Sequence, residues 1–446
     1  RESYLPRMVS GEWSGTMNLT EPQAGSDLAA IRSQAVPEGS HYRVSGQKIF
    51  ITWGDHDMTA NVVHLVLARL PDAPAGTRGI SLFLVPKFIP GPDGEPGERN
   101  AVHPVSVEHK LGIHGSPTCV MAFEGAVGYL VGEEHQGLAC MFTMMNHARL
   151  GVGMEGIAIA ERAYQQALAY ARERVQGRVP GIEGRAAIIN HADVRRMLLT
   201  MKAQIEAMRS LGYVVAASLD FARAAEDPAE RARHQARVEL LTPVVKGWCT
   251  ETGQQLASLG VQIHGGMGYV EETGAAQHLR DARITTIYEG TTGIQAADFV
   301  GRKVLRDRGA ALAALIGDMT ATVAELARAG APLAMLHEAL REGVGDLKAA
   351  AAWLAANHER HPGIPGAVSF NFLMLTGTVA GGWQLARAAL AARAELAAGT
   401  ADSAFCEAKL LTARFYAGQL MPMAGALRRG IEAGCEELLA LPEEQF

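Results

Sequence analysis

The sequence predicts an α+β protein: an antiparallel β domain at residues 1–137, a four-helix bundle at 138–308 and a further helical domain at 309–446. First, apolar and polar residues alternate from about Glu12 to Glu134, in short runs separated by Gly, Pro, Asp and Asn clusters. Second, apolar residues recur at spacings of three and four from about Leu138. Third, the chain beyond Arg308 is rich in alanine, which favours helices.

The individual elements follow from the same patterns. Strands are expected around residues 42–44, 49–51, 62–67, 80–85, 102–107 and 120–123. Bundle helices are expected over 138–174, 194–208, 231–259 and 293–305, and extension helices over 310–329, 332–357, 366–397 and 402–439. Loops are expected at 360–365 and 398–401. The uncharged run 363–386 contains Pro, Gly, Asn and Gln, which favours a buried helix over a membrane span.

The net charge and the cysteine pattern argue against several classes of function and site. The net charge is -6 and no run of Lys and Arg occurs, which argues against a nucleic-acid surface. The 5 cysteines have no CxxC spacing, so we expect neither a disulfide framework nor a metal site. No signal peptide opens the chain, so we expect a soluble, cytoplasmic protein without a membrane segment. The start at Arg1 suggests a piece of a longer protein.

Glu289 is the candidate catalytic residue. It follows the apolar residues Ile284, Ile287 and Tyr288 and precedes a turn rich in glycine and threonine. Apolar surroundings disfavour the charged form of a carboxylate and raise its pKa, as a general base requires. A solvated loop glutamate is the alternative interpretation of this motif alone.

Two segments of the β domain could meet a flat heteroaromatic cofactor. The loop at residues 19–27 offers backbone N–H groups and the Thr20 hydroxyl, with Ser26 at its far end. A hairpin is expected at 45–52, and alternation would place Phe50 and Thr52 on the same side of a strand. The alternatives are an ordinary turn and an aromatic side chain in a core.

Three helical motifs complete the set. Residues 172–178 (RERVQGR) end a helix with cations and a glycine, residues 262–269 (QIHGGMGY) break the helical pattern with glycines, and residues 146–149 (NHAR) carry a donor and a cation one turn apart. Each also has a structural interpretation, and we expect His264 to be structural rather than catalytic.

Together and in this order, these motifs resemble the acyl-CoA dehydrogenase family over about residues 4–306. The motifs that carry the resemblance are TEPQAGSD, the FIT tripeptide, ERVQGR, QIHGGMGY and IYEGTTGIQ. The resemblance implies FAD as the cofactor and an acyl-CoA as the substrate. The FAD-binding residues that it implies are Met17, Leu19, Thr20, Ser26, Phe50, Ile51, Thr52, Arg174, Gln176, Gln262, Gly265, Gly266, Thr291 and Gly293.

The resemblance also implies roles for these residues. Arg174, Gln176 and residues 262–266 would reach the FAD of a neighbouring subunit, which implies a homodimer or a dimer of dimers. The substrate-binding residues that it implies are Ser26, Asn146, Arg149, Tyr288 and Gly290.

The mechanism that the resemblance implies is a dehydrogenation. Glu289 would remove the α-proton of the thioester while the β-hydride passes to flavin N5, giving a trans-2-enoyl-CoA. The backbone N–H of Glu289 would stabilise the thioester oxygen, and an electron-transfer flavoprotein would accept the electrons. Three alternatives stay open: an acyl-CoA oxidase that uses O2, a flavin-dependent monooxygenase, and a non-catalytic flavoprotein that binds a partner or nucleic acid.

Some residues depart from the family's pattern. Phe50 stands where Trp is common, Gly293 replaces a frequent Gln, and ERVQGR lacks the usual Phe before its glycine. The extension resembles that of larger bacterial members, which act on 3-methylmercaptopropionyl-CoA or fatty acyl-CoA thioesters. The family's N-terminal helical domain would precede Arg1.

Overall fold

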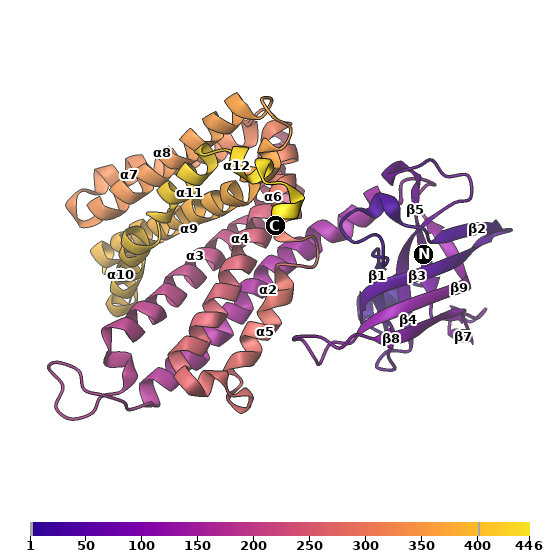
Figure 1. Ribbon diagram of the computed structural model, residues 1–446, viewed down its shortest axis with the longest axis horizontal. Helices are drawn as coiled ribbons and strands as arrows, with labels where there is room; N and C mark the ends of the chain where they lie inside the picture. The colour runs from indigo at the N-terminus through magenta and orange to yellow at the C-terminus, as the bar shows by residue number, and fades with distance from the viewer. Residues whose placement is uncertain (1–2, 400–401) are drawn as a thin grey trace. The chain divides into compact units, whose positions relative to one another are not determined.

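The computed structural model describes residues 3–399 and 402–446. The end of the loop predicted at 398–401 therefore lies outside the described residues. The chain separates into two compact units, residues 1–147 and 148–446, which are described in turn (Figure 1).

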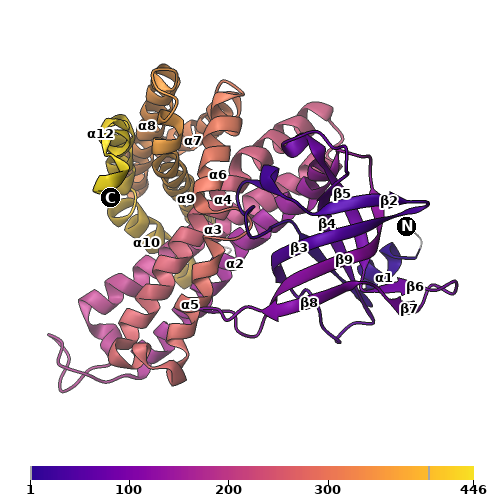
Figure 2. The same ribbon diagram turned by 45° about the vertical axis from the view of Figure 1, so that its right-hand side comes forward.

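The first unit is a β domain whose main sheet closes on itself (Figure 2). Hydrogen-bonded neighbours run from β4 through β5, β9, β3 and β2 back to β4, while β1 and β8 pair with β4 and β9. Among the described strands of this sheet, β1 and β2 lie parallel to β4 and the other pairings are antiparallel. The strands are β1 Trp13–Asn18, β2 Gln34–Glu38, β3 His41–Thr52, β4 Asn61–Arg69, β5 Ile80–Pro86, β6 Phe88–Pro90, β7 Pro96–Arg99, β8 Val102–Val107 and β9 Thr118–Val131.

The predicted strands are present, but the hairpin predicted at 45–52 is wrong. Residues 42–44 and 49–51 belong to one continuous strand, β3. The ladder between β3 and β9 shifts register between Val44 and Ser45, so the irregularity is a bulge and not a turn. Gly46 serves a close approach there, because a Cβ on it would lie 2.3 Å from Ser33 Oγ.

The second unit is helical. Its first part holds α3 Ala192–Ala224, α4 Pro228–His264, α5 Ala275–Thr285, α6 Thr292–Asp298 and a π-helical segment, η6, Phe299–Leu305, together with most of α2 Gly137–Glu173. Helix α4 begins where local chemistry predicts a start, with Pro228 in the first turn and the Asp227 side chain accepting a hydrogen bond from the Ala229 N–H.

The extension contributes α7 Ala310–Ala329, α8 Ala334–Asn357, α9 Ile364–Ala398, α10 Ser403–Gln419, α11 Met423–Glu432 and α12 Glu436–Ala440. The single helix predicted over 402–439 is therefore three helices. The first break falls at Leu420–Pro422, since proline removes a backbone donor and ends the preceding helix.

Helix α9 is central to the packing of this unit. It contacts α3, α4, α6, α7, α8, α10 and α11. At its closest approach to α4, a Cβ on Gly377 would lie 2.2 Å from the Trp248 ring, and one on Gly381 would lie 2.6 Å from it. Bundle and extension thus share one hydrophobic core, and a boundary between them at residue 308 stays a prediction.

Two helices in the described part of the chain, α7 and α9, are long and apolar enough to cross a membrane. Two-thirds of the most apolar stretch of α9 is buried inside the protein. That burial identifies α9 as a core helix, as the sequence predicted.

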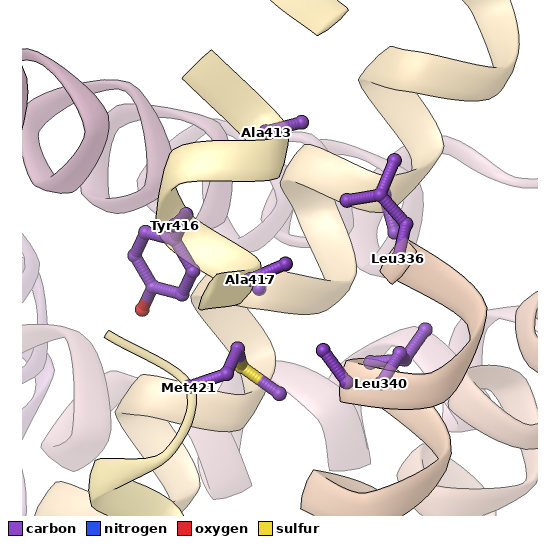
Figure 3. A pocket seen from close by; sticks show the side chains of 9 residues that line it. Leu336, Leu340, Ala413, Tyr416, Ala417 and Met421 are labelled. Carbon is purple, nitrogen blue, oxygen red and sulfur yellow. The ribbon is translucent and has the colours of Figure 1, made fainter. Parts of the chain in front are cut away.

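A small cavity of about 10 Å³ lies among α8, α9 and α10 (Figure 3). Leu336, Leu340, Ala417 and Met421 are among its lining residues. It has room for about one water molecule at most, and its walls are mostly apolar. Tyr416 keeps its hydroxyl bonded to the Thr378 carbonyl at 2.9 Å, so the cavity leaves this buried donor satisfied.

Candidate active site and cofactor-binding residues

Glu289 lies in a tight turn between α5 and α6. Glu289 and Gly290 both adopt left-handed conformations, with φ of 55° and 86°. For a residue with a side chain this conformation costs roughly 1–2 kcal/mol, so surrounding contacts must hold it. The turn closes through the Thr292 N–H, which donates to the Thr286 carbonyl at 3.0 Å. Strain of this kind at a carboxylate fits a functional turn rather than an ordinary loop.

The surroundings of Glu289 have the predicted electrostatic character. Burial raises the pKa of this carboxyl, while the nearby charges of Arg149 and Lys246 lower it. The opposing effects give a carboxylate that is ionised more easily than burial alone would permit and is more basic than an exposed one.

The backbone around the carboxylate is held by two buried side chains. Gln295 Nε2 donates to the Glu289 carbonyl at 3.1 Å, and Lys246 Nζ donates to the Gly290 carbonyl at 2.7 Å. The Glu289 N–H itself has no hydrogen-bond partner among residues 3–399 and 402–446. This donor is therefore available for a ligand oxygen.

Two further carboxylates support the turn. Glu251 of α4 accepts a hydrogen bond from Thr292 Oγ1 at 2.6 Å, and Glu155 of α2 accepts one from the Tyr288 hydroxyl. Sequence reasoning missed Lys246, Glu251, Glu155 and Gln295. A signal was present for Lys246, because a lysine in the otherwise apolar run 240–249 is unusual unless it has partners.

In the β domain, the loop at residues 19–27 is fixed by a buried ion pair. Lys48 Nζ lies 2.8 Å from Glu21 Oε1 and also donates to the Leu19 carbonyl at 3.0 Å. The Ile49 N–H donates to the Thr20 carbonyl at 2.9 Å, so the loop is tied to β3 through its backbone. Met17, Leu19 and Thr20 are partly exposed, and Ser26 is exposed.

The FIT tripeptide forms the end of β3. Phe50 is 61% exposed and left-handed, with φ of 61°, and the ladder to β9 shifts register between Lys48 and Ile51. Ile51 is buried, whereas Phe50 and Thr52 are both exposed, and their position on the same side of the strand stays a prediction. A largely exposed aromatic side chain is not a core residue and suits a ligand face.

The predicted cofactor segments of the helical unit lie at the ends of long helices. Arg174 and Gln176 are exposed just after α2, where the Gln176 N–H donates to the Ala186 carbonyl at 3.0 Å. Gln262, Gly265 and Gly266 are exposed around the end of α4. Exposed residues at such helix ends remain accessible to a ligand.

His264 is structural, as expected. Its Nδ1 lies 2.7 Å from the Gly260 carbonyl, and its ring stacks on Tyr170 of α2 with centroids 4.5 Å apart. The residue therefore ties α4 to α2 beneath the glycine-rich segment.

The predicted substrate residues fall into different surroundings. Asn146 and Ser26 are exposed, whereas Arg149 is buried, 3.8 Å from Asp298 and close enough to Glu289 to affect its pKa. Tyr288 and Gly290 flank the carboxylate and are partly exposed. In the turn that begins α6, Thr291 is partly exposed and Gly293 is exposed. Within the helical unit, the structure thus brings together Arg149, Tyr288, Glu289 and Gly290.

The residues present fit FAD by their chemistry. A flavin needs an apolar surface for its ring and hydrogen-bonding groups for its polar edge, and the outward side chains of Phe50 and Thr52 supply both. In the β domain, the partly exposed Thr20 also offers a hydroxyl. In the helical unit, considered by itself, Arg174 carries a positive charge of the kind that pyrophosphate groups attract.

Three family models match the chain. The model described as "Acyl-CoA dehydrogenase, middle domain" matches residues 16–126, and "Acyl-CoA dehydrogenase, C-terminal domain" matches residues 135–305. A third, "Acetyl-CoA dehydrogenase C-terminal like", matches residues 295–442 in the extension.

Relatives and solved structures point the same way. The chain is 53% identical over 423 residues to 3-methylmercaptopropionyl-CoA dehydrogenase of Ruegeria pomeroyi, covering 94% of this chain and 71% of the relative. It is 39% identical to the broad-specificity linear acyl-CoA dehydrogenase FadE5 of Mycobacterium tuberculosis, covering 97% of this chain and 74% of the relative.

The fold matches that of an acyl-CoA dehydrogenase from Bacillus anthracis solved in complex with FAD. The TM-score is 0.76 with 22% sequence identity, and the match covers 99% of this chain and 72% of that chain. By family models and relatives over most of its length, the chain belongs to the acyl-CoA dehydrogenase family of FAD-dependent oxidoreductases.

Proposed function

We propose that this protein converts an acyl-CoA thioester to the trans-2-enoyl-CoA, with Glu289 as the base that removes the α-proton. The observation that carries the proposal is the Glu289 carboxylate itself: its pKa is raised by burial, and Arg149 and Lys246 lie near enough to lower it. Such a group is more basic than an exposed carboxylate, which suits the removal of a weakly acidic proton.

The backbone of the same residue supplies the second element of the chemistry. An α-proton is acidic only if the negative charge that develops on the thioester oxygen is stabilised. The Glu289 N–H has no partner among the described residues, so it can donate to that oxygen. Bound FAD supplies the hydride acceptor in this family. Glu289 would thus take the proton with its carboxylate and stabilise the oxygen with its amide.

The preferred substrate is 3-methylmercaptopropionyl-CoA or a fatty acyl-CoA. The relative at 53% identity carries the first activity in its name, and the relative at 39% identity acts on linear acyl-CoA thioesters by its name. One methylene in an apolar pocket changes binding by only about 1–3 kcal/mol, so discrimination between short chains would be moderate.

The proposal also includes the oligomeric state, the electron acceptor and the cellular location. Exposure of Arg174, Gln176 and Gln262 supports their use by the FAD of a neighbouring subunit, in a homodimer or a dimer of dimers. An electron-transfer flavoprotein would accept the electrons. The five cysteines are free, which supports a reducing, cytoplasmic location.

The test is an anaerobic titration of the FAD-loaded protein with butanoyl-CoA, octanoyl-CoA and 3-methylmercaptopropanoyl-CoA. We expect the flavin absorbance to bleach with at least one thioester and mass spectrometry to show a product lighter by two hydrogens. A protein that binds FAD but is bleached by none of the three would contradict the proposal. Rapid reoxidation by air would instead identify an oxidase.

A further inference from the structure

Lys246 is a buried ammonium group in the middle of α4, beside the proposed base. The residue is completely buried, and its Nζ donates to the Gly290 carbonyl at 2.7 Å. Gly290 directly follows Glu289, so the lysine holds the backbone next to the proposed base. Gln295 holds the preceding carbonyl, that of Glu289, at 3.1 Å.

These two donors bind the strained backbone of the turn at Glu289 and Gly290. Glu289 and Gly290 are both left-handed, and a Cβ on Gly290 would lie 2.6 Å from Gln295 Nε2. The turn is therefore packed closely against Gln295 on one side and hydrogen-bonded to α4 on the other. Loss of either donor would free the turn to leave this conformation.

The charges around Lys246 belong to several elements. The nearby charges of Glu251 on α4, Glu155 on α2 and Glu289 favour its protonated form, and that of Arg149 on α2 opposes it. Tyr288 donates to Glu155, and Thr292 donates to Glu251. Asp298 lies near both Arg149 and Arg302, and the part of α9 that precedes Arg387 contains no charged residue.

We propose that Lys246 is a positioning residue for Glu289. Its hydrogen bond to Gly290 fixes the left-handed turn that aims the carboxylate, and its positive charge sets the pH range in which that carboxylate is ionised. The inference deepens the proposed function, because it takes Glu289 to be the base.

The direction of the pH effect follows from the charges. Burial lowers the pKa of Lys246 and the surrounding carboxylates partly offset it, which leaves the pKa at about 8, so the ammonium is present at neutral pH. Removal of that cation withdraws one of the two charges that lower the pKa of Glu289. The pKa of Glu289 then rises, and the acid limb of the rate profile moves to higher pH.

The experiment separates the hydrogen bond from the charge. Lys246→Met removes both, whereas Lys246→Gln keeps an uncharged donor on a side chain one atom shorter. The rate of flavin reduction at a saturating concentration of thioester is measured by anaerobic stopped flow between pH 5 and 9, and KM and FAD content are recorded for each variant. Lys348→Met, which removes an exposed lysine of α8, is the matched control.

For Lys246→Met we expect a rate at least about 10-fold lower at pH 7 and an acid limb higher by about one pH unit or more, with FAD content and KM close to wild type. Lys246→Gln should show the same shift of the acid limb but a smaller loss of rate, because the turn keeps a donor. The control should match wild type in every measurement.

Two results would overturn the inference. In one, both Lys246 variants keep the wild-type rate and acid limb. In the other, the rate falls only in proportion to lost FAD and the acid limb stays in place, which is the signature of a purely structural lysine. If Lys246→Met does not fold, Lys246→Gln decides by its acid limb alone. Failure of the proposed function differs from both, because the wild type would then not be bleached by any thioester.

Discussion

Lys48 and Glu21 form an ion pair of 2.8 Å inside the β domain, with the lysine side chain fully buried and that of the glutamate 4% exposed. The glutamate also accepts hydrogen bonds from the Arg32 and Ser33 N–H groups and from Ser33 Oγ. The pair therefore joins β3 to the loop that is proposed to meet the flavin and to the segment leading into β2.

Glu21→Gln should destabilise the protein and weaken FAD binding together. Removing one member of a buried pair leaves the other charge uncompensated, which costs roughly 3–5 kcal/mol. We expect a loss of that size in urea unfolding and a lower FAD content after purification. The matched control is Glu38→Gln, which removes a partner of Arg43 at the surface and should leave the stability close to that of wild type. Equal losses in the two variants would contradict this account.

The same pair predicts an acid-sensitive loop. Burial alone would raise the pKa of Glu21, but the charge of Lys48 and the hydrogen bonds outweigh it and lower the pKa to about 2. Because the carboxyl pKa is lower in the folded protein than the 4.5 of an unfolded chain, Glu21 stabilises the fold above pH 4.5, and this contribution is lost as the pH falls toward 2. FAD release and unfolding of wild type should therefore begin below about pH 4.5.

His64 predicts a second, separate pH dependence. It is fully buried, its Nδ1 lies 2.7 Å from Thr16 Oγ1, and desolvation lowers its pKa from 6.5 to about 4. Because the folded protein disfavours the imidazolium, His64 contributes to the free energy of unfolding fully above pH 6.5, and this contribution is lost as the pH falls to about 4. The lost free energy of unfolding is about 3 kcal/mol, at 1.36 kcal/mol per unit of pKa shift.

The measurement is urea unfolding at pH 7 and pH 4. His64→Gln should lose less stability than wild type over this range, whereas His114→Gln, at an exposed position, should behave as wild type. If His64→Gln retains the full pH dependence of wild type, the buried imidazole is not its source.

Gly377 lies where α9 of the extension packs against α4 of the bundle, and a substitution there tests how tight this contact is. A Cβ at this position would lie 2.2 Å from the Trp248 ring, and neither helix can move without disturbing the core. Gly377→Ala should therefore cost roughly 1–3 kcal/mol from overpacking. Gly345→Ala is the control in the open interior of α8, where a Cβ meets nothing within 4 Å, and it should be neutral or stabilising by up to about 1 kcal/mol. Thermal unfolding of the two variants in parallel distinguishes a close helix contact from a general intolerance of alanine.

The sequence predicted what depends on local pattern. Short apolar runs bounded by turn residues located β4 and β5, and spacings of three and four located α2 and α4. The hairpin at 45–52 was wrong because a bulge and a turn both use glycine, and only the position of Ser33 reveals which one Gly46 serves.

In the candidate site, too, local features could be predicted from the sequence and contacts between distant residues could not. Glu289 could be named as the candidate base because its apolar neighbours and its glycine-rich turn are adjacent in sequence and because the IYEGTTGIQ motif resembles that of the family. Lys246 could not be assigned to it, since its partner, the Gly290 carbonyl, is 44 residues away and the contact exists only once α4 packs against the turn. Arg149 was predicted as a substrate residue, but its influence on the Glu289 carboxyl became visible only in the folded chain.

The most direct test of the central claim is the rate of flavin reduction in Glu289→Gln, measured by anaerobic stopped flow with the thioester that bleaches wild type best. Glutamine keeps the size of the side chain and the backbone N–H but cannot take a proton. We predict a rate lower by at least about 10³-fold, with FAD content and thioester binding close to wild type. A Glu289→Gln protein that reduces its flavin within about 10-fold of the wild-type rate would show that another group removes the α-proton.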